Sequence, residues 1–140
     1  MPGEHEVLTR ENPHQRGSRA INQHLVRLLA QELDLDAYPL KSAGTGQLLA
    51  QAGSKLTRLP YLVSGILHAV VHVGEQGNQI IPVTFETGEL ALLSALFSEE
   101  PLHGDLVAAQ DLTLRWIPIV DIEQGLQRSQ ALLVLLVRFL

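Results

Sequence analysis

Two histidines are the side chains of this sequence with the spacing best suited to chemistry. His68 and His72 are predicted on one face of a strand, because side chains alternate between the two faces of an extended chain. Imidazoles at this spacing could bind a metal ion or a haem. The spacing is more typical of two ordinary strand histidines, and no His-x-His pattern with a following glutamate accompanies them. A cupin-like metal-dependent enzyme is therefore kept as an alternative, while the leading interpretation has no metal site and no cofactor.

Three glutamates and one serine are further candidates for catalysis. Glu75, Glu86 and Glu89 could form paired carboxylates, but they lie at predicted turns and loop edges, where solvated acids are common. Ser64 lacks the G-x-S-x-G pattern of a hydrolase nucleophile. Residues 44–46 (GTG) are too sparse for a dinucleotide loop, and no βαβ unit surrounds them. We therefore predict no catalytic residues and a protein that is not an enzyme.

The charge pattern of the middle of the chain argues against phosphate binding there. No lysine or arginine occurs from Leu59 to Leu114. The acids in the same stretch are Glu75, Glu86, Glu89, Glu99, Glu100, Asp105 and Asp111. A phosphate needs a cation or a dense array of backbone donors, and an acidic wall without a guanidinium repels it.

The composition limits the class of protein. A chain of 140 residues fits one domain, and 46% hydrophobic against 18% charged residues indicates a folded core. A formal net charge of −5 disfavours nonspecific binding to nucleic acid or to an anionic membrane. The absence of cysteine excludes disulfides and thiolate metal sites. The polar N-terminus lacks an apolar signal region, and the apolar runs are too short to span a bilayer. We expect a cytoplasmic protein.

Helical patterns occur near both ends. Residues 1–18 indicate a flexible leader, and apolar residues at three- and four-residue spacing predict a helix from Ala20 to about Leu33. A short leucine-rich helix is predicted over 89–97, and residues 98–104 are predicted as a polar loop. Another helix is expected to begin at residues 121–123. Ser129 is placed to cap a last helix from Gln130, and that helix is apolar all round.

The centre of the chain predicts short strands separated by turns. They are expected over residues 47–50, 61–63, 66–73, 80–85, 106–109 and 112–117. Residues 74–78 are typical of a hairpin turn, and Pro82 indicates an edge position or a bulge. Pro118 is expected to end the last strand. This spacing predicts a mainly β fold, an antiparallel β-roll (double-stranded β-helix or jelly roll) with flanking helices.

Five short sequence motifs follow one another along this pattern of strands and turns. They are residues 46–53 (GQLLAQAG), 59–65 (LPYLVSG), 74–77 (GEQG), 85–89 (FETGE) and 108–111 (AAQD). In this order they resemble the cyclic-nucleotide-binding-like effector domain of catabolite-activator-type (Crp–Fnr) transcription regulators. The second segment is the most specific, since it is similar to the family pattern hydrophobic–Tyr–hydrophobic–Val–x–Gly. The resemblance covers about residues 20–140 and implies a sensor domain.

The resemblance also implies a degenerate phosphate cassette. In members that bind nucleotide, a Glu holds the ribose and an Arg holds the cyclic phosphate. An ungapped register places Leu93 and His103 at these positions, whereas a register with one insertion places Leu102 at the Arg position. The candidate ligand-binding residues are Gly88, Glu89, Leu93, Leu102, His103 and Gly104. We expect no micromolar binding of cyclic nucleotide, and the existence of another small-molecule effector stays open.

The resemblance further implies a domain division and a partner. Residues 1–18 would be the leader, 19–128 the β-roll, and 129–140 the start of a dimerisation helix, with the DNA-binding domain expected to be absent from this chain. The partner would be a second copy, with contacts through Leu132, Leu133, Leu136, Phe139 and Leu140. DNA would be reached only through the missing domain, and no membrane contact is expected. The leading alternative is a ligand-free dimerisation or partner-binding module.

Overall fold

The computed structural model describes residues 13–73, 78–93, 96 and 100–139. Its helices are α2 (Pro13–Leu29), the 3-10 helix η1 (Leu35–Ala37), α3 (Ile119–Arg128) and α4 (Gln130–Phe139). Its strands are β1 (Leu40–Ala43), β2 (Leu48–Ala50), β3 (Arg58–Ser64), β4 (Ile66–Val73), β5 (Asn78–Glu86), β6 (Asp105–Ala108) and β7 (Leu112–Pro118). Among the described residues, no helix is long and apolar enough to cross a membrane.

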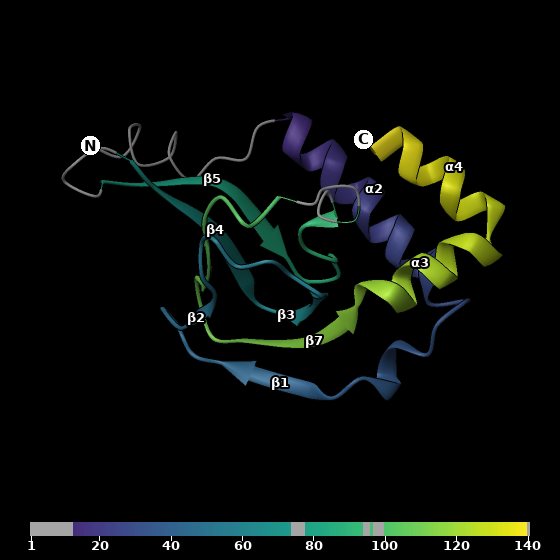
Figure 1. Ribbon diagram of the computed structural model, residues 1–140, viewed down its shortest axis with the longest axis horizontal. Helices are drawn as coiled ribbons and strands as arrows, with labels where there is room; N and C mark the ends of the chain where they lie inside the picture. The colour runs from purple at the N-terminus through teal and green to yellow at the C-terminus, as the bar shows by residue number, and fades with distance from the viewer. Residues whose placement is uncertain (1–12, 74–77, 94–95, 97–99, 140) are drawn as a thin grey trace.

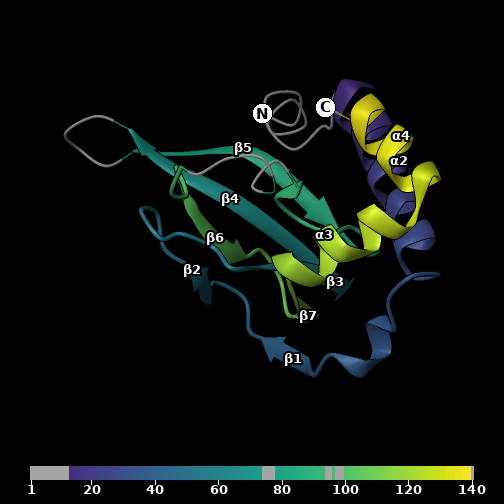
Figure 2. The ribbon, with the colours of Figure 1, turned by 45° about the vertical axis from the view of Figure 1, so that its right-hand side comes forward.

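The strands form two antiparallel sheets, and the helices gather at one end of them (Figure 1). One sheet has the order β1-β7-β3, and the other has the order β2-β6-β4-β5. Helices α2 and α4 lie against each other, and α3 connects β7 to α4 (Figure 2). The predicted antiparallel β-roll with flanking helices is confirmed.

Two clusters of buried side chains hold these layers together. One lies between the sheets and includes Leu62, Leu67, Leu106 and Leu114, each at most 1% exposed. The other lies where the helices cover the roll and includes Leu25, Leu29, Leu59, Leu93, Ile117, Ile122 and Leu132. Residues 59 and 117 pair across β3 and β7, so this sheet contributes to both clusters.

The first helix differs from its prediction at both ends. It begins at Pro13, so residues 13–18 of the predicted leader are helical. It ends at Leu29 rather than near Leu33, because two of the following amides bond three residues back rather than four: Gln31 N–H donates to Leu28 C=O at 3.1 Å, and Glu32 N–H donates to Leu29 C=O at 2.9 Å. The tightened turn leads the chain into η1.

The hairpin of β4 and β5 has the predicted edge position and irregularity. β5 is an edge strand, and its register moves from Ala69 opposite Val83 to Val71 opposite Ile80. β5 therefore carries one extra residue in this interval, which contains Pro82, as expected for a strand proline. The predicted turn residues 74–77 lie outside the described residues.

The helix predicted over 89–97 does not begin where it was expected. Leu90 forms a β-bridge with Tyr61, the next two residues form a turn, and single-turn 3-10 geometry occurs at Leu93 and Leu96. Residues 94, 95 and 97–99 lie outside the described part of the chain. The first two residues of the predicted polar loop, 98 and 99, are among them. The cap of the last helix is confirmed, since Leu132 N–H donates to Ser129 Oγ at 3.2 Å.

Candidate functional site

Residues 88–91 form the entry to the predicted cassette, and their backbone donors already have acceptors within the protein. The acceptors are Leu62 C=O for Gly88, Glu86 C=O for Glu89, the Asn22 side chain for Leu90 and Pro60 C=O for Ala91, at 2.8 to 3.1 Å. These bonds attach the segment to β3 on one side and to α2 on the other. Because each of the four N–H groups is engaged, a phosphate would have to displace a bond of the fold to use one of them.

Arg19 of α2 reaches the same segment and pairs with two of its acids. Its Nε donates to Glu89 Oε1, and its Nη1 lies 2.8 Å from Glu86 Oε2. Its Nη2 donates to the Thr84 carbonyl at 3.2 Å. The side chains of Arg19 and Glu89 are 13% and 5% exposed, so this ion pair is largely shielded from solvent.

The pairing by Arg19 corrects the expectation of an acidic wall without a guanidinium. The cation comes from the N-terminal helix, outside the stretch from Leu59 to Leu114 that lacks Lys and Arg. It neutralises Glu86 and Glu89 rather than an added ligand. Every nitrogen of its guanidinium group has a protein acceptor, so it does not offer a free fork to a phosphate.

Arg19 belongs to a row of three polar side chains on α2 that hold residues 84–90. Asn22 is 3% exposed and bonds both the N–H and the C=O of Leu90 at 2.8 Å. Gln23 Nε2 donates to the Thr87 carbonyl at 2.9 Å. The sequence signal was present, because positions i, i+3 and i+4 share one face of a helix. Only the apolar stripe of this helix entered the sequence interpretation.

Leu93 and its neighbour lie on the core side of the cassette. Leu93 is 2% exposed and packs in the cluster beneath the helices, so it does not line an open space where the family places a ribose ligand. Leu92 has a φ of 64°, a left-handed backbone that leucine rarely adopts, and its side chain packs against both buried clusters. The two leucines anchor the turn by burial.

The remaining cassette residues lie against a different part of the roll. Leu102 N–H donates to Ser54 C=O at 2.9 Å, and Leu102 C=O accepts from Gly53 N–H at 2.8 Å. His103 is 79% exposed at its side chain and contacts Glu100 Oε2 at 2.9 Å. A Cβ at Gly104 would lie 2.6 Å from the Val70 carbonyl oxygen, so glycine is needed for close packing on β4.

The six predicted ligand-binding residues make their contacts in different parts of the fold. Gly88 and Glu89 lie beside α2, Leu93 is in the helix-facing core, and residues 102–104 lie along residues 53–54 and β4. The structure brings together the two cassette-entry residues and, separately, the three loop residues.

The two strand histidines have separate environments. Partial burial lowers the pKa of His68, which favours its neutral form. His72 Nε2 lies 3.2 Å from Asp105 Oδ2, and this carboxylate also accepts the Ala52 N–H at 2.7 Å. That backbone hydrogen bond is the main reason why the pKa of Asp105 is lowered. Within the described residues, no group of three His, Asp or Glu side chains is placed to hold a metal ion.

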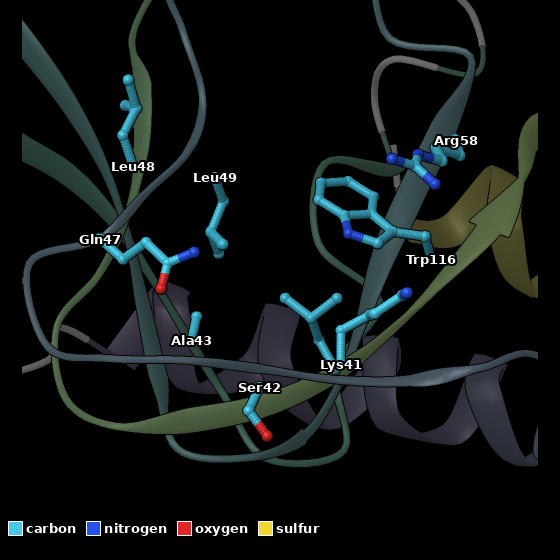
Figure 3. A pocket seen from close by; sticks show the side chains of 9 residues that line it. Lys41, Ser42, Ala43, Gln47, Leu48, Leu49, Arg58 and Trp116 are labelled. Atoms are coloured by element: carbon cyan, nitrogen blue, oxygen red, sulfur yellow. The ribbon is translucent and has the colours of Figure 1, made fainter.

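A pocket of about 380 Å³ opens between β1, β3 and β7 on one side and β2 on the other, and this opening is called the open end of the roll below (Figure 3). Its lining residues are Lys41, Ser42, Ala43, Gln47, Leu48, Leu49, Arg58, Leu114 and Trp116. Figure 3 shows Lys41, Arg58 and Trp116 on one side and Gln47, Leu48 and Leu49 on the other. The guanidinium carbon of Arg58 lies 4.8 Å from the centroid of the Trp116 ring. Sequence reasoning missed this site, because Lys41 and Arg58 lie outside the strands that the sequence predicted.

The predicted dimerisation residues of α4 have different exposures. Leu132 is fully buried against the chain's own helices, which corrects its assignment to a dimer surface. Leu133 is 45% exposed, and Val134 and Val137 are 51% and 75% exposed. The side chains of Leu136 and Phe139, and the whole of Leu140, lie outside what the structure describes. Among the described side chains, the exposed large apolar residues of α4 are Leu133, Val134 and Val137.

The fold is similar to that of several sensor domains of bacterial transcription regulators. The sensor domain of the transcriptional regulator DNR from Pseudomonas aeruginosa superposes with a TM-score of 0.71 at 19% identity, over 89% of this chain and 86% of that one. The longer DNR chain gives 0.67 at 17% identity, and this chain spans 59% of it. The Thermus thermophilus catabolite activator protein gives 0.64 at 18% identity, over 82% of this chain and 51% of that one.

Sequence comparison adds nothing to these structural likenesses, because the chain matches no protein-family model and no curated protein. At identities below one in five, the likeness concerns the arrangement of the chain. The fold is accordingly the cyclic-nucleotide-binding-like β-roll that these regulator sensor domains share.

Proposed function

We propose that this chain is the sensor or effector domain of a Crp–Fnr-type transcription regulator, and that it does not bind cyclic nucleotide in the usual way. The β-roll and its likeness to regulator sensor domains support the first part. The second part is supported by one observation, which is the ion pairing of Arg19 with the cassette entry. The domain would act in the cytoplasm and would reach DNA through a domain outside this chain.

Calorimetric titration with cyclic AMP and cyclic GMP tests the ligand part of this proposal. The expected result is no saturable binding at micromolar concentration. A charge-assisted bidentate contact contributes a few kcal/mol, so a cassette without a free guanidinium should bind roughly two orders of magnitude more weakly. One-to-one binding below about ten micromolar would overturn this part of the proposal.

The regulatory part of the proposal requires association of two copies. The exposed surface of Leu133, Val134 and Val137 on α4 supports such a contact, because contiguous apolar patches on monomers usually mark interaction sites. Light scattering of the unmodified chain should give the mass of a dimer, and Val137→Glu should shift it to a monomer. Gln127→Glu, which changes an exposed residue of α3, is the matched control. A monomer at every concentration would contradict this contact.

The alternative of a ligand-free dimerisation module is favoured by the same internal bonds of the cassette. It differs from the sensor by its response, since its self-association should not change with any small molecule. The cupin-like enzyme has no comparable support, because the described residues contain no three-ligand group beside His68 or His72. Metal analysis of the purified protein separates this last alternative from the other two.

A further inference from the structure

We propose that the open end of the roll binds a small organic anion with a flat apolar body, held between Lys41, Arg58 and Trp116. The volume of about 380 Å³ falls within the range of small-molecule sites. This site is separate from the cassette and is lined by none of the six residues discussed above. It rests on the geometry of the strands and would stand even if the chain regulated nothing.

The strand registers place both cations on the inner face of the roll. Lys41 is paired opposite Leu114, which is 1% exposed and belongs to the core between the sheets. Pro60 is paired opposite Trp116, and Arg58 is two residues before it on the same face of β3. Cross-strand partners share a face of a sheet. Both side chains are exposed, so the two cations lie at the rim of the roll interior, where a ligand can reach them from solvent.

The charges around the pocket favour an anion. The chain as a whole has a formal net charge of −5, yet no carboxylate lines this pocket. Among the residues that the structure describes, no acid forms an ion pair with Lys41 or Arg58. The ring of Trp116 holds the Arg58 guanidinium through a cation–π contact and leaves its charge uncompensated. Two cations of this kind attract a carboxylate or a phosphate.

The remaining walls suit a flat apolar body. Leu48 and Leu49 face Trp116 across the pocket, Leu114 lies beside Trp116 on β7, and an indole prefers offset stacking with a planar ring. Gln47 Oε1 accepts the Gly44 N–H at 3.1 Å, so the amide nitrogen of Gln47 remains as a donor at the rim. The ligand class that matches these walls is a ring carboxylate or a ring phosphate.

Edge protection is the competing explanation for the inward cations. β1 and β3 are the two edges of their sheet, and inward-pointing charges at edge strands hinder pairing with other chains. On that explanation the pocket would show no saturable binding of either ring anion. A titration of the protein with ring anions therefore separates the two explanations.

Trp116 supplies the signal for this titration, because it is the single tryptophan of the chain. The probes are phenylacetate and phenyl phosphate, and the matched neutral probe is phenylacetamide. A saturable fluorescence change with at least one anion, and none with the amide at the same concentrations, is the expected result. A preference between the two anions identifies whether the pocket selects carboxylate or phosphate.

Two variants then test whether Lys41 and Arg58 contribute to the binding that the fluorescence of Trp116 reports. Lys41→Gln and Arg58→Gln should each weaken binding about tenfold, which corresponds to one charge-assisted contact. Arg27→Gln removes an exposed cation from α2 and should leave the affinity unchanged. Because Arg58→Gln also removes the cation above the fluorophore, affinities are compared and checked by calorimetry. The proposal is overturned if neither anion saturates, if phenylacetamide binds equally well, or if both variants keep the unmodified affinity.

Discussion

The cassette entry and the open end of the roll each contain an arginine, but the two arginines have opposite surroundings. Arg19 is enclosed by Glu86, Glu89 and the Thr84 carbonyl, and its side chain is 13% exposed. Arg58 lies over an aromatic ring beside a second cation and an open pocket. In a protein, a guanidinium can serve a ligand only where its charge and its donors are not already engaged by the fold. Arg19 therefore has a structural role, whereas the guanidinium of Arg58 is available to contact a ligand.

The pairing with Arg19 also explains how the cassette entry holds Glu86 and Glu89 close together without uncompensated repulsion between their charges. Glu89 is 3% exposed, and a carboxylate that is buried to this degree requires a partner. Arg19 supplies that partner from α2, while Asn22 fixes the backbone one residue further. The helix and the cassette thus form one unit, whose internal contacts take the place that a ligand would need.

The substitution with the largest expected effect replaces Leu93, the residue that the ungapped register places at a ribose-binding position. Leu93→Glu places a charge at a position that is 2% exposed among leucines, and it should lower the free energy of unfolding by about 4 kcal/mol. His103→Arg changes an exposed side chain and should stay within about 0.5 kcal/mol. Denaturant unfolding measures both variants.

A double variant that combines these two substitutions tests the ungapped alignment of the cassette with nucleotide-binding regulators. Because Leu93 faces the core and His103 faces solvent, the double variant should not gain affinity for cyclic AMP. A stably folded double variant that binds cyclic AMP would mean that the two positions can converge on a ligand. The Leu102→Arg variant is the equivalent check for the register with an insertion.

The second test removes the guanidinium from the cassette entry. Arg19→Gln removes the guanidinium that pairs with the shielded carboxylate of Glu89, so the free energy of unfolding should fall by about 3 kcal/mol. Arg27→Gln, on the exposed side of the same helix, should change it by less than about 0.5 kcal/mol. Equal stabilities of the two variants would show that the ion pair does not hold α2 to the cassette.

The third test concerns the far end of the cassette. A methyl group at Gly104 would lie 2.6 Å from the Val70 carbonyl oxygen, so Gly104→Ala should cost about 2 kcal/mol through overpacking against β4. At Gly44 the nearest atom would be Asp111 Oδ1 at 3.8 Å, an ordinary contact, so Gly44→Ala is a matched control. A Gly104→Ala variant as stable as this control would indicate that the loop is free to move toward a ligand.

Much of the fold could be predicted from short-range patterns. Alternation gave β4 its bounds of Ile66 and Val73, and the strand proline indicated the irregularity of β5. Ser129 was identified as a cap because a hydroxyl before an apolar helix serves that purpose. Each of these inferences depends on residues close together in the sequence, where local geometry decides the outcome.

The site was harder to predict because it depends on residues distant in the sequence. Arg19 and Glu89 are separated by 70 positions, and the stretch without cations was interpreted as though only its own residues could neutralise it. Leu90 lost its predicted helix because α2 and β3 bind its backbone from both sides, which local propensity cannot reveal. The inward cations needed the register of three strands before they could be placed together.

The smallest expected effect is the stability change on removal of the cations at the open end of the roll. Lys41 has no acidic partner within the described residues, so Lys41→Gln should leave the free energy of unfolding within about 0.5 kcal/mol. Arg58→Gln loses the contact with the Trp116 ring and should cost about 0.5 to 1 kcal/mol. Denaturant unfolding without any added ligand should therefore rank Arg19→Gln as the most destabilising, then Arg58→Gln, then Lys41→Gln. A cost above about 1 kcal/mol for Lys41→Gln would mean that this lysine stabilises the fold, and the contrast between an engaged and an available cation would fail at that residue.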